Sequence, residues 1–434
     1  MVEKLVPKLR FNEFHDEWNT IFLNSILSFK NGFNASKDQY GFGTKFINVS
    51  DILENNYLTY DNIQDYVNIN DIELTNYIIE YGDIVFQRSS ENREEVGTAN
   101  VYLGSQPCVY GGFVIRGKKE GEYNPFFLKE LLQSTRVRKE ITSWSGGSTR
   151  YNIGQDSLNK ISIILPSIEE QNKIADLLLK VYEKIDLLEY KYQCYKNFKK
   201  YLMQQIFTQK LRFNFTDEWE KYLLGDISSI GKGFTPSTGN PSFWDGDLKW
   251  LSIADMNQGK YINQTTKKIT SDGSKNKEPV KKGTLLMSFK LSIGKLGILT
   301  EDMYTNEAIC NFKWKNKDVL TEYMYYYLSS INILKYGSQA AKGITLNNET
   351  LSTIPVLLPS IEEQKKIINI LSDVDLKINM LENSINDTSK FKKGLLQQMF
   401  NYVLILNQYF VFVRFLIFLD YLLIFLIVFH THNY

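Results

Sequence analysis

Apolar residues recur at heptad spacing over two long stretches of the chain. Each stretch opens with a serine, Ser167 or Ser360, that is followed three residues later by a glutamate, the spacing of a helix capping box. The pattern predicts long helices within 166–208 and 358–400. The expected seam residues are Ile174, Leu178, Val181, Ile185, Leu188 and Leu202 in the first helix, and Ile367, Leu371, Val374, Ile378, Leu381 and Leu395 in the second.

A stripe this narrow needs an equally narrow partner. The simplest partner of each helix is the other, so we expect an antiparallel two-stranded coiled coil. Lys199, Thr388 and Lys392 interrupt the stripe. The alternative is that each helix packs only on the surface of its own domain. A helix of about 40 residues spans about 60 Å, so paired helices would hold two globular parts a fixed distance apart.

The two helices belong to a larger internal repeat. Residues 165–171 and 358–364 both read LPSIEEQ, and residues 8–12 and 210–214 both read KLRFN. The period is far too long for a solenoid, so it indicates a duplicated domain. Short β-like runs and glycine turns fill the stretches between the helices. The predicted fold is therefore α+β, with two mixed α/β domains joined by two long antiparallel helices in a pseudo-two-fold repeat.

The repeat also sets the expected domain boundaries. They are a first globular domain at 1–165, a central helix at 166–208, a second globular domain at 209–357, a distal helix at 358–400 and an atypical apolar tail at 401–434.

The composition excludes several classes of protein. A net charge of +1 is not that of a histone-like polycation, so any nucleic-acid contact must be local. Cys108, Cys194 and Cys310 lie far apart without a C-x-x-C pair, which argues against a disulfide framework or a zinc site and favours a reducing, cytoplasmic compartment. No secretory signal opens the chain. With only 3 histidines, histidine-based acid–base catalysis has almost no candidates.

Two short motifs resemble functional sequences but lack the companions that they need. Asn124–Phe127 (NPFF) is similar to the motif with which amino-methyltransferases hold a flipped base, yet no glycine-rich S-adenosylmethionine loop accompanies it. Gly231–Ser237 (GKGFTPS) lacks the P-loop pattern. We therefore predict no catalytic residue and no metal ligand.

Several segments carry a resemblance to a known family. They are 31–36 (NGFNAS), 46–52 (FINVSDI), 82–89 (GDIVFQRS), 233–250 (GFTPSTGNPSFWDGDLKW), 283–290 (GTLLMSFK) and 351–364 (LSTIPVLLPSIEEQ). Together with the repeated helices, they make residues 5–400 similar to the specificity (S) subunit of type I restriction-modification systems, the HsdS family.

The resemblance implies a DNA-specificity subunit that is itself non-catalytic. Two target-recognition domains would each read one half of a split site in double-stranded DNA, and the helices would dock two methyltransferase (M) subunits. Motor-nuclease (R) subunits would complete the complex. S-adenosylmethionine, ATP and Mg²⁺ would bind to those partners, and no cofactor would bind to this chain.

Polar and basic loop residues are the candidates for DNA contact, because reading bases and gripping phosphates both require such side chains. In the first domain they are Gln87, Arg88, Ser89, Ser90, Arg93, Ser148, Thr149, Arg150, Tyr151 and Asn152, and in the second they are Ser288, Lys290, Ser292, Lys295, Lys342, Thr345, Asn347 and Asn348. The alternative for each is an ordinary solvated turn residue.

The tail departs from the family resemblance. Tyr409–Phe429 is long and apolar enough for a membrane span, but Arg414 and Asp420 would make the span costly. We therefore expect no membrane contact and interpret the tail as a frameshifted or read-through extension; a tail anchor is the alternative. A further alternative for the whole chain is an interaction scaffold whose coiled coil joins two ligand-binding lobes.

Overall fold

The computed structural model describes residues 5–290, 292–340, 343–400 and 402–404. The chain forms two compact units: unit 1 comprises Met1–Leu187 with Ile385–Tyr434, and unit 2 comprises Leu188–Ser384. Each unit contains one globular domain, part of the first long helix and part of the second.

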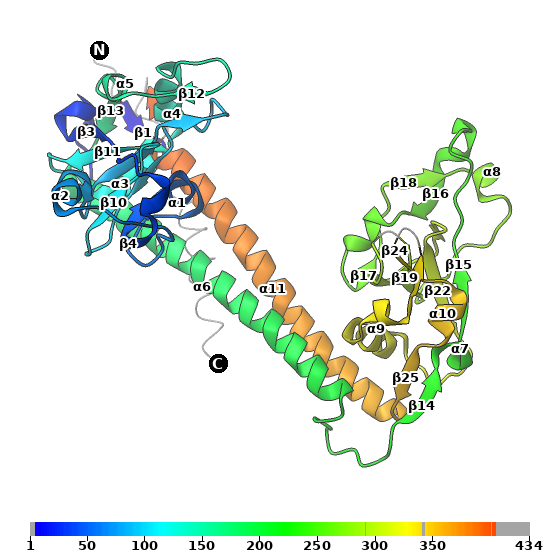
Figure 1. The fold of residues 1–434 in the computed structure, drawn as a ribbon. Coiled ribbons are helices and arrows are strands. Elements are labelled where there is room, and N and C mark those ends of the chain that lie inside the picture. Colours follow the sequence, from blue (N-terminus) through cyan, green and yellow to red (C-terminus); the bar gives the residue numbers. More distant parts are fainter. Residues whose placement is uncertain (1–4, 291, 341–342, 401, 405–434) are drawn as a thin grey trace. The chain divides into compact units, whose positions relative to one another are not determined.

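The domain of unit 1 is built on two four-stranded sheets, with the strand orders β5-β4-β10-β6 and β3-β11-β7-β9 (Figure 1). The strands are β3 (Leu27–Asn31), β4 (Tyr40–Ile47), β5 (Tyr66–Val67), β6 (Ile78–Ile79), β7 (Ile84–Gln87), β9 (Ala99–Val101), β10 (Cys108–Tyr110) and β11 (Val114–Lys119). The sequence of β7, IVFQ, is a short apolar run, and all four of its side chains are buried in the sheet.

Short ribbons and helices complete unit 1. The ribbons pair β1 (Leu5–Pro7) with β26 (Tyr402–Leu404), β2 (Asn19–Phe22) with β13 (Ser162–Leu165), and β8 (Ser89–Ser90) with β12 (Tyr151–Asn152). The helices are α1 (Val49–Glu54), α2 (Asp71–Tyr77), α3 (Pro125–Leu132), α4 (Thr135–Ser143) and α5 (Gln155–Leu158), with 3-10 turns η1 (Leu23–Ser25) and η2 (Lys37–Gln39).

The domain of unit 2 has a five-stranded sheet, β15-β22-β19-β20-β17, and a three-stranded sheet, β18-β16-β21. The strands are β14 (Glu220–Leu223), β15 (Ser228–Lys232), β16 (Trp244–Leu251), β17 (Tyr261–Ile262), β18 (Lys267–Ile269), β19 (Leu285–Ser288), β20 (Leu296–Leu299), β21 (Tyr304–Thr305), β22 (Ile309–Trp314), β23 (Ser338–Ala340), β24 (Gly343–Thr345) and β25 (Pro355–Leu358). The helices are α7 (Leu224–Ile227), α8 (Ser271–Ser274), α9 (Thr321–Ser330) and α10 (Asn348–Ser352), with η3 (Pro241–Phe243), η4 (Ala254–Asn257) and η5 (Ile333–Tyr336).

The strand pairings of the first domain recur in the second. The antiparallel pairs β3–β11, β11–β7 and β7–β9 correspond to β15–β22, β22–β19 and β19–β20. Likewise, β4 pairs antiparallel with β5 and parallel with β10, as β16 does with β18 and β21. The repeat in the sequence is therefore a duplication of the fold.

The long helices are α6 (Ile168–Phe207) and α11 (Ile361–Met399), close to the predicted ranges. In unit 1, Ile174 and Leu178 near the start of α6 share one buried core with Leu395 and Met399 near the end of α11. Val181 and Ile185 continue this core along α6.

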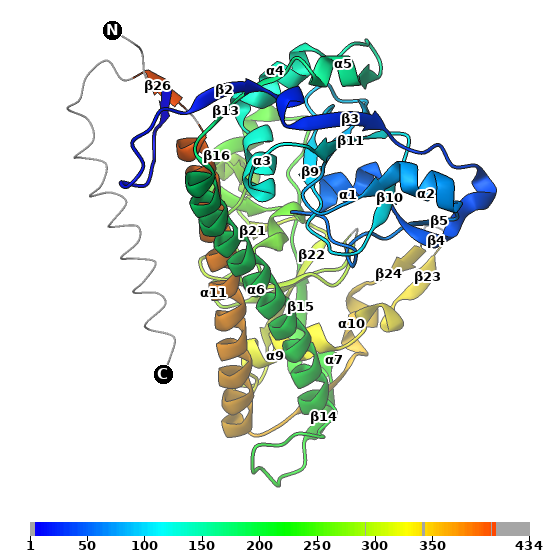
Figure 2. The same cartoon turned by 90° about the vertical axis from the view of Figure 1, so that its left-hand side faces the viewer.

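Unit 2 shows the reverse combination of helix ends. Leu202, near the end of α6, shares a buried core with Ile367, Leu371 and Val374, near the start of α11. Leu381 is also buried, whereas Leu188 and Ile378 are half-buried. In both units α6 and α11 therefore run antiparallel, side by side (Figures 1 and 2). Both cores also contain residues of the adjacent domain, so each helix end packs on its domain as well as on the other helix.

The apolar tail lies almost entirely outside the described residues. Its residues 402–404 form β26, which pairs antiparallel with β1 in the register Leu5↔Leu404. The stretch Tyr409–Phe429 belongs to the part of the chain that is not described. Of the helices that the structure does describe, none combines the length and the apolar character that crossing a membrane requires.

Candidate DNA interface

The fold brings together the two predicted DNA-contact segments of the first domain. Ser89 and Ser90 in β8 pair with Asn152 and Tyr151 in β12, and the Ser89 hydroxyl donates to Asn152 Oδ1 at 2.5 Å. Asn152 also exchanges two backbone hydrogen bonds with Gly146, which closes the loop 146–152. This loop carries Ser148, Thr149 and Arg150, all exposed.

An exposed phenylalanine extends this surface. Phe113 precedes β11 and is 60% exposed. The Arg150 guanidinium lies 5.9 Å from the centre of its ring, and Arg88 Nη1 donates to the Gly112 carbonyl at 3.2 Å. Arginine, hydroxyl, amide and aromatic groups are the side chains that grip phosphates, read base edges and stack on bases. We call Arg88, Ser89, Phe113, Arg150, Tyr151 and Asn152 the first-domain patch.

Two candidates in the first domain, Gln87 and Ser90, are buried, whereas Arg93 is exposed. Gln87 is 3% exposed, and its Nε2 donates to the Ser89 carbonyl. Ser90 is buried, and its hydroxyl donates to Glu95 Oε2. Burial of both does not fit direct contact with a base, because a group that is shielded from solvent is equally shielded from DNA. Arg93 is exposed and donates to the Thr142 carbonyl at 3.4 Å.

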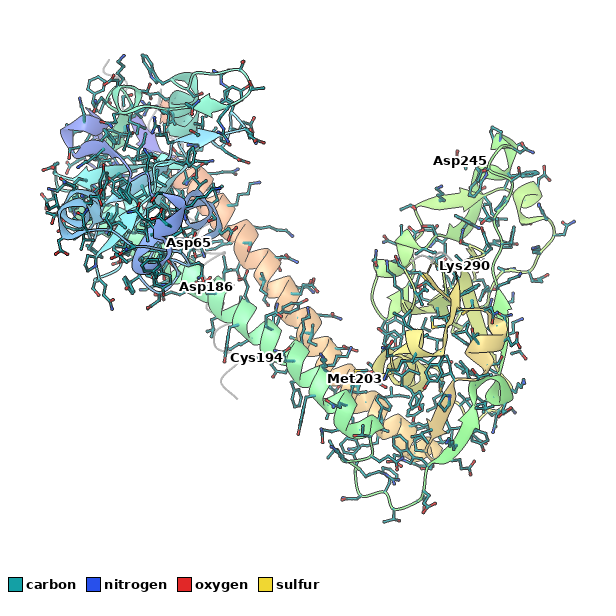
Figure 3. The ribbon with its side chains drawn as sticks, in the orientation of Figure 1. Asp65, Asp186, Cys194, Met203, Asp245 and Lys290 are labelled. Atoms are coloured by element: carbon teal, nitrogen blue, oxygen red, sulfur yellow. The ribbon has the colours of Figure 1, made fainter. Side chains whose placement is uncertain are left out.

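In the second domain, the buried Ser288 stabilises a loop through hydrogen bonds of its hydroxyl. It is 0% exposed; its hydroxyl donates to the Ser292 carbonyl and accepts from the Lys295 amide. The expectation that Ser288 faces DNA is therefore corrected to a structural role. Lys290 and Ser292 are exposed on this loop, and Lys295 is half-buried (Figure 3 labels Lys290).

The remaining candidates of the second domain lie around β24 and α10. Lys342 is outside the described residues, and the backbone of Thr345 pairs with Ser338. Asn347 is the N-cap of α10, where its Oδ1 accepts from the Thr350 amide at 2.8 Å. Asn348 donates to the Ile230 carbonyl at 3.0 Å. Both asparagines are exposed, but each already has a structural hydrogen bond.

The two buried thiols are not activated nucleophiles. Cys108 and Cys310 are buried, and desolvation raises the pKa of each to about 12, so both stay protonated near neutral pH. Cys194 is exposed on α6. Among the described residues, no group of three or more His, Cys, Asp or Glu side chains is arranged to hold a metal ion.

The repeated heptapeptide fastens each domain to its long helix. In unit 1, Glu170 accepts two hydrogen bonds from Arg10, at 2.8 and 2.7 Å. In unit 2, Glu363 accepts two from Arg212, both at 2.8 Å, and a third from Trp219 Nε1 at 3.0 Å. The arginine of KLRFN therefore forms a bidentate ion pair with the second glutamate of LPSIEEQ in both copies.

The glutamine of the same heptapeptide ties in a second helix. Gln171 Oε1 accepts from the backbone amide of Asn124 at 3.0 Å, and Gln364 Oε1 accepts from that of Leu320, also at 3.0 Å. Asn124 and Leu320 are the N-cap residues of α3 and α9. The repeats are visible in the sequence, but these contacts are not, because the partners are far apart along the chain.

A family model matches both domains. The model of the type I restriction modification DNA specificity domain matches residues 15–194 and again residues 216–388. The two matches cover most of the chain. The chain therefore belongs to the family of type I restriction-modification specificity proteins, and it carries the specificity domain twice.

Curated relatives carry the same description. The putative type I restriction enzyme MjaX specificity subunit of Methanocaldococcus jannaschii is 23% identical over 423 residues, covering 91% of this chain and 95% of that one. The EcoBI specificity subunit of Escherichia coli is 22% identical over 407 residues, covering 86% and 82%. The MjaIX specificity subunit of M. jannaschii is 29% identical over 189 residues, which is 42% of either chain.

Solved structures share the fold. The S subunit of a type I restriction-modification system from M. genitalium has a TM-score of 0.57 at 15% identity, covering 91% of this chain and 99% of that one. A chain from a study of the assembly of the type I R-M system has a TM-score of 0.57 at 14% identity, covering 88% and 97%. At such identities the likeness concerns the fold alone.

Proposed function

We propose that this protein is the DNA-specificity subunit of a type I restriction-modification complex and that it reads a bipartite site in double-stranded DNA. The observation that carries the proposal is the duplication itself: two domains with the same strand pairings, each clamped by the same Arg–Glu pair to a long helix. Two reading domains of one design suit a target in two parts.

In this proposal the first-domain patch contacts one half of the target. Arg88 and Arg150 supply positive charge for phosphates, while Ser89, Tyr151 and Asn152 present hydrogen-bonding groups for bases. On the second domain, the exposed loop with Lys290, Ser292 and the half-buried Lys295 takes the corresponding part.

The long helices form a coiled coil that spaces the domains and docks two methyltransferase subunits. Support comes from the antiparallel packing in each unit and from apolar side chains that α6 and α11 leave exposed, among them Tyr190, Phe198, Tyr201 and Leu376. The chemistry belongs to the partners, which would hold S-adenosylmethionine, ATP and Mg²⁺, together with motor-nuclease subunits. This chain would be non-catalytic.

The test selects DNA from a random duplex pool with the full chain and its methyltransferase partner. We expect enrichment of a split motif, and exchanging 209–357 for the same segment of a relative should change one half of the motif only. A change in both halves would contradict the assignment, and enrichment of no motif would favour an interaction scaffold.

The patch is tested in the same assay by Arg150→Ala. We expect weaker binding and a shallower dependence of affinity on salt, because one phosphate contact is lost. The matched control is Lys118→Ala, which removes an exposed positive charge from β11 of the same domain. Equal effects of both substitutions would show that the patch has no special role.

A further inference from the structure

The two lysines that interrupt the helix seams have aromatic partners in the structure. Lys392 on α11 lies with its Nζ 4.1 Å from the centre of the Tyr182 ring, within unit 1. Lys199 on α6 lies 5.5 Å from the centre of the Tyr326 ring, within unit 2, and 2.6 Å from Asp375 Oδ1. Lys199 and Lys392 occupy the same place in the two copies of the repeat (FKK). The two lysines therefore lie at equivalent places, where a domain packs on its long helix.

In unit 1 the junction joins α3 to α6 through a phenol and a carboxylate. The Tyr182 hydroxyl, on α6, donates to Glu130 Oε1, on α3, at 2.8 Å. Lys129 Nζ donates to the same oxygen at 2.7 Å. Glu130 and Tyr182 are both buried, and the burial raises the pKa of the Tyr182 phenol well above its usual range. The phenol therefore remains a donor.

In unit 2 the junction joins α9 to α11 by the same chemistry. The Tyr326 hydroxyl, on α9, donates to Asp375 Oδ2, on α11, at 2.7 Å. Lys260 approaches the same hydroxyl at 3.3 Å and donates to Ser372 Oγ at 3.1 Å. Tyr326 is fully buried.

The phenol and the carboxylate have exchanged places between the two junctions. Gln171 and Gln364 bind the N-cap residues of α3 and α9 in the same way, so they fix which positions correspond. Counted from those contacts, Glu130 of α3 corresponds to Tyr326 of α9. Tyr182 of α6 corresponds to Asp375 of α11. In the first copy the domain supplies the carboxylate, and in the second copy the domain supplies the phenol.

If either domain docked on the other domain's long helix, two like side chains would face each other at the junction. The first domain would set the buried Glu130 against the half-buried Asp375, and two carboxylates at close range repel each other. The second domain would set Tyr326 against Tyr182, which leaves a buried hydroxyl without its charged acceptor and costs about 1–3 kcal/mol. Both mismatches are penalised, whereas both native pairs are charge-assisted hydrogen bonds.

We propose that the exchanged tyrosine and carboxylate make each helix junction selective for its own domain. The pairs Glu130–Tyr182 and Tyr326–Asp375 act as positioning residues that fix which domain is fastened to which long helix. If the proposed function holds, they also fix the order in which the two half-sites are read.

The decisive experiment uses a chimera of the full chain in which residues 220–358 also replace residues 19–165. Tyr182→Asp is then made in the natural chain and in the chimera, and the midpoints of thermal unfolding are compared. We expect the substitution to lower Tm by several degrees in the natural chain and to raise Tm in the chimera, where it restores the native pair. A change of the same sign in both proteins would overturn the proposal.

A second set of variants applies if the chimera does not fold. In the natural chain, Tyr326→Glu and Asp375→Tyr are made singly and together. Each single substitution should lower Tm, and the double substitution should recover most of the loss, whereas additive losses would overturn the proposal. Lys281→Ala, in the exposed pair with Asp302, is the control that should leave Tm nearly unchanged. Because Tm is measured without DNA, these outcomes are independent of DNA reading.

Discussion

At the scale of single residues, two buried glutamates fasten the domains to the long helices. The Glu170 side chain is 1% exposed and that of Glu363 is 2% exposed, and each accepts a bidentate ion pair from an arginine at the start of its domain. A carboxylate at such a depth depends on its partner, because removing one member of a buried pair leaves an uncompensated charge.

Removing the arginine should therefore destabilise the attachment of the domain to its long helix. We expect Arg10→Met to lower the free energy of unfolding by about 2–4 kcal/mol, toward the lower end of the range for buried pairs because Arg10 is partly exposed. Denaturant titration of the full chain gives the value. Lys173→Met, which breaks the exposed Lys173–Glu13 pair, should cost less than about 1 kcal/mol. Similar losses for both variants would contradict a special role of the buried pair.

Two aspartates at equivalent places in the two domains have pKa values that shift in opposite directions. Asp51 and Asp255 accept hydrogen bonds from the backbone amides of Asn48 and Ser252 at the same place in the two domains. Burial raises the pKa of Asp51. Burial also acts to raise the pKa of Asp255, but hydrogen bonds from Ser252 and Thr266 outweigh it and hold that pKa below its usual range.

The sign of each stability contribution follows from these directions. The contribution of Asp51 is fully present below the unfolded pKa of about 3.9 and is lost as pH rises through its raised pKa. That of Asp255 is present above about pH 3.9 and is lost as pH falls through its lowered pKa. Between pH 3 and 6, Asp51→Asn should gain stability relative to the natural chain as pH rises, and Asp255→Asn should lose it. Parallel pH profiles of the two variants would refute the assignment.

At the scale of elements, the long helices were the most predictable part of the molecule. The heptad spacing gave Ile168–Phe207 and Ile361–Met399 to within a few residues, because one apolar face recurs over many turns. The pairing of β8 with β12 had no such signal, since it joins two-residue strands that are far apart in the sequence. Pattern alone also did not separate the buried Gln87 and Ser288 from exposed neighbours, because both are the last residues of strands.

Phe113 is the opposite case, because its position along the chain suggests burial but its side chain is exposed. An aromatic residue beside an apolar strand reads as core, yet its place in the turn before β11 leaves it exposed. The contact that would have indicated the patch comes from Arg150, on a different segment.

The loop 146–152 can be perturbed with a matched pair of glycines. Gly147 has φ +120°, and a Cβ there would lie 2.1 Å from the Arg150 carbonyl oxygen, whereas a Cβ at Gly146 would meet open space. We expect Gly147→Ala to displace Arg150 and weaken DNA binding through the first half-site, and Gly146→Ala to have little effect. DNA selection with each variant measures both. Equal motifs and affinities would mean that the loop does not touch DNA.

At the scale of the whole molecule, the proposed docking of methyltransferase subunits would require a surface that the fold leaves open. Tyr190 is 70% exposed on α6, away from the seam. Tyr190→Glu should leave Tm almost unchanged but weaken co-purification of the methyltransferase subunit, because a charge would be buried on docking. Ile72→Glu, at an exposed position on α2, is the control. Loss of the partner in both variants, or in neither, would argue against docking on this face.

The ribbon of β1 and β26 has a consequence for how the protein can be re-engineered. Leu5 and Leu404 are register partners, so the backbone before the first domain passes next to the backbone that leaves α11. A short peptide could close this gap, and a cut in the 208–219 connector would then supply new termini. Such a circular permutant would carry its two domains in the opposite order along the chain while keeping the fold of each unit.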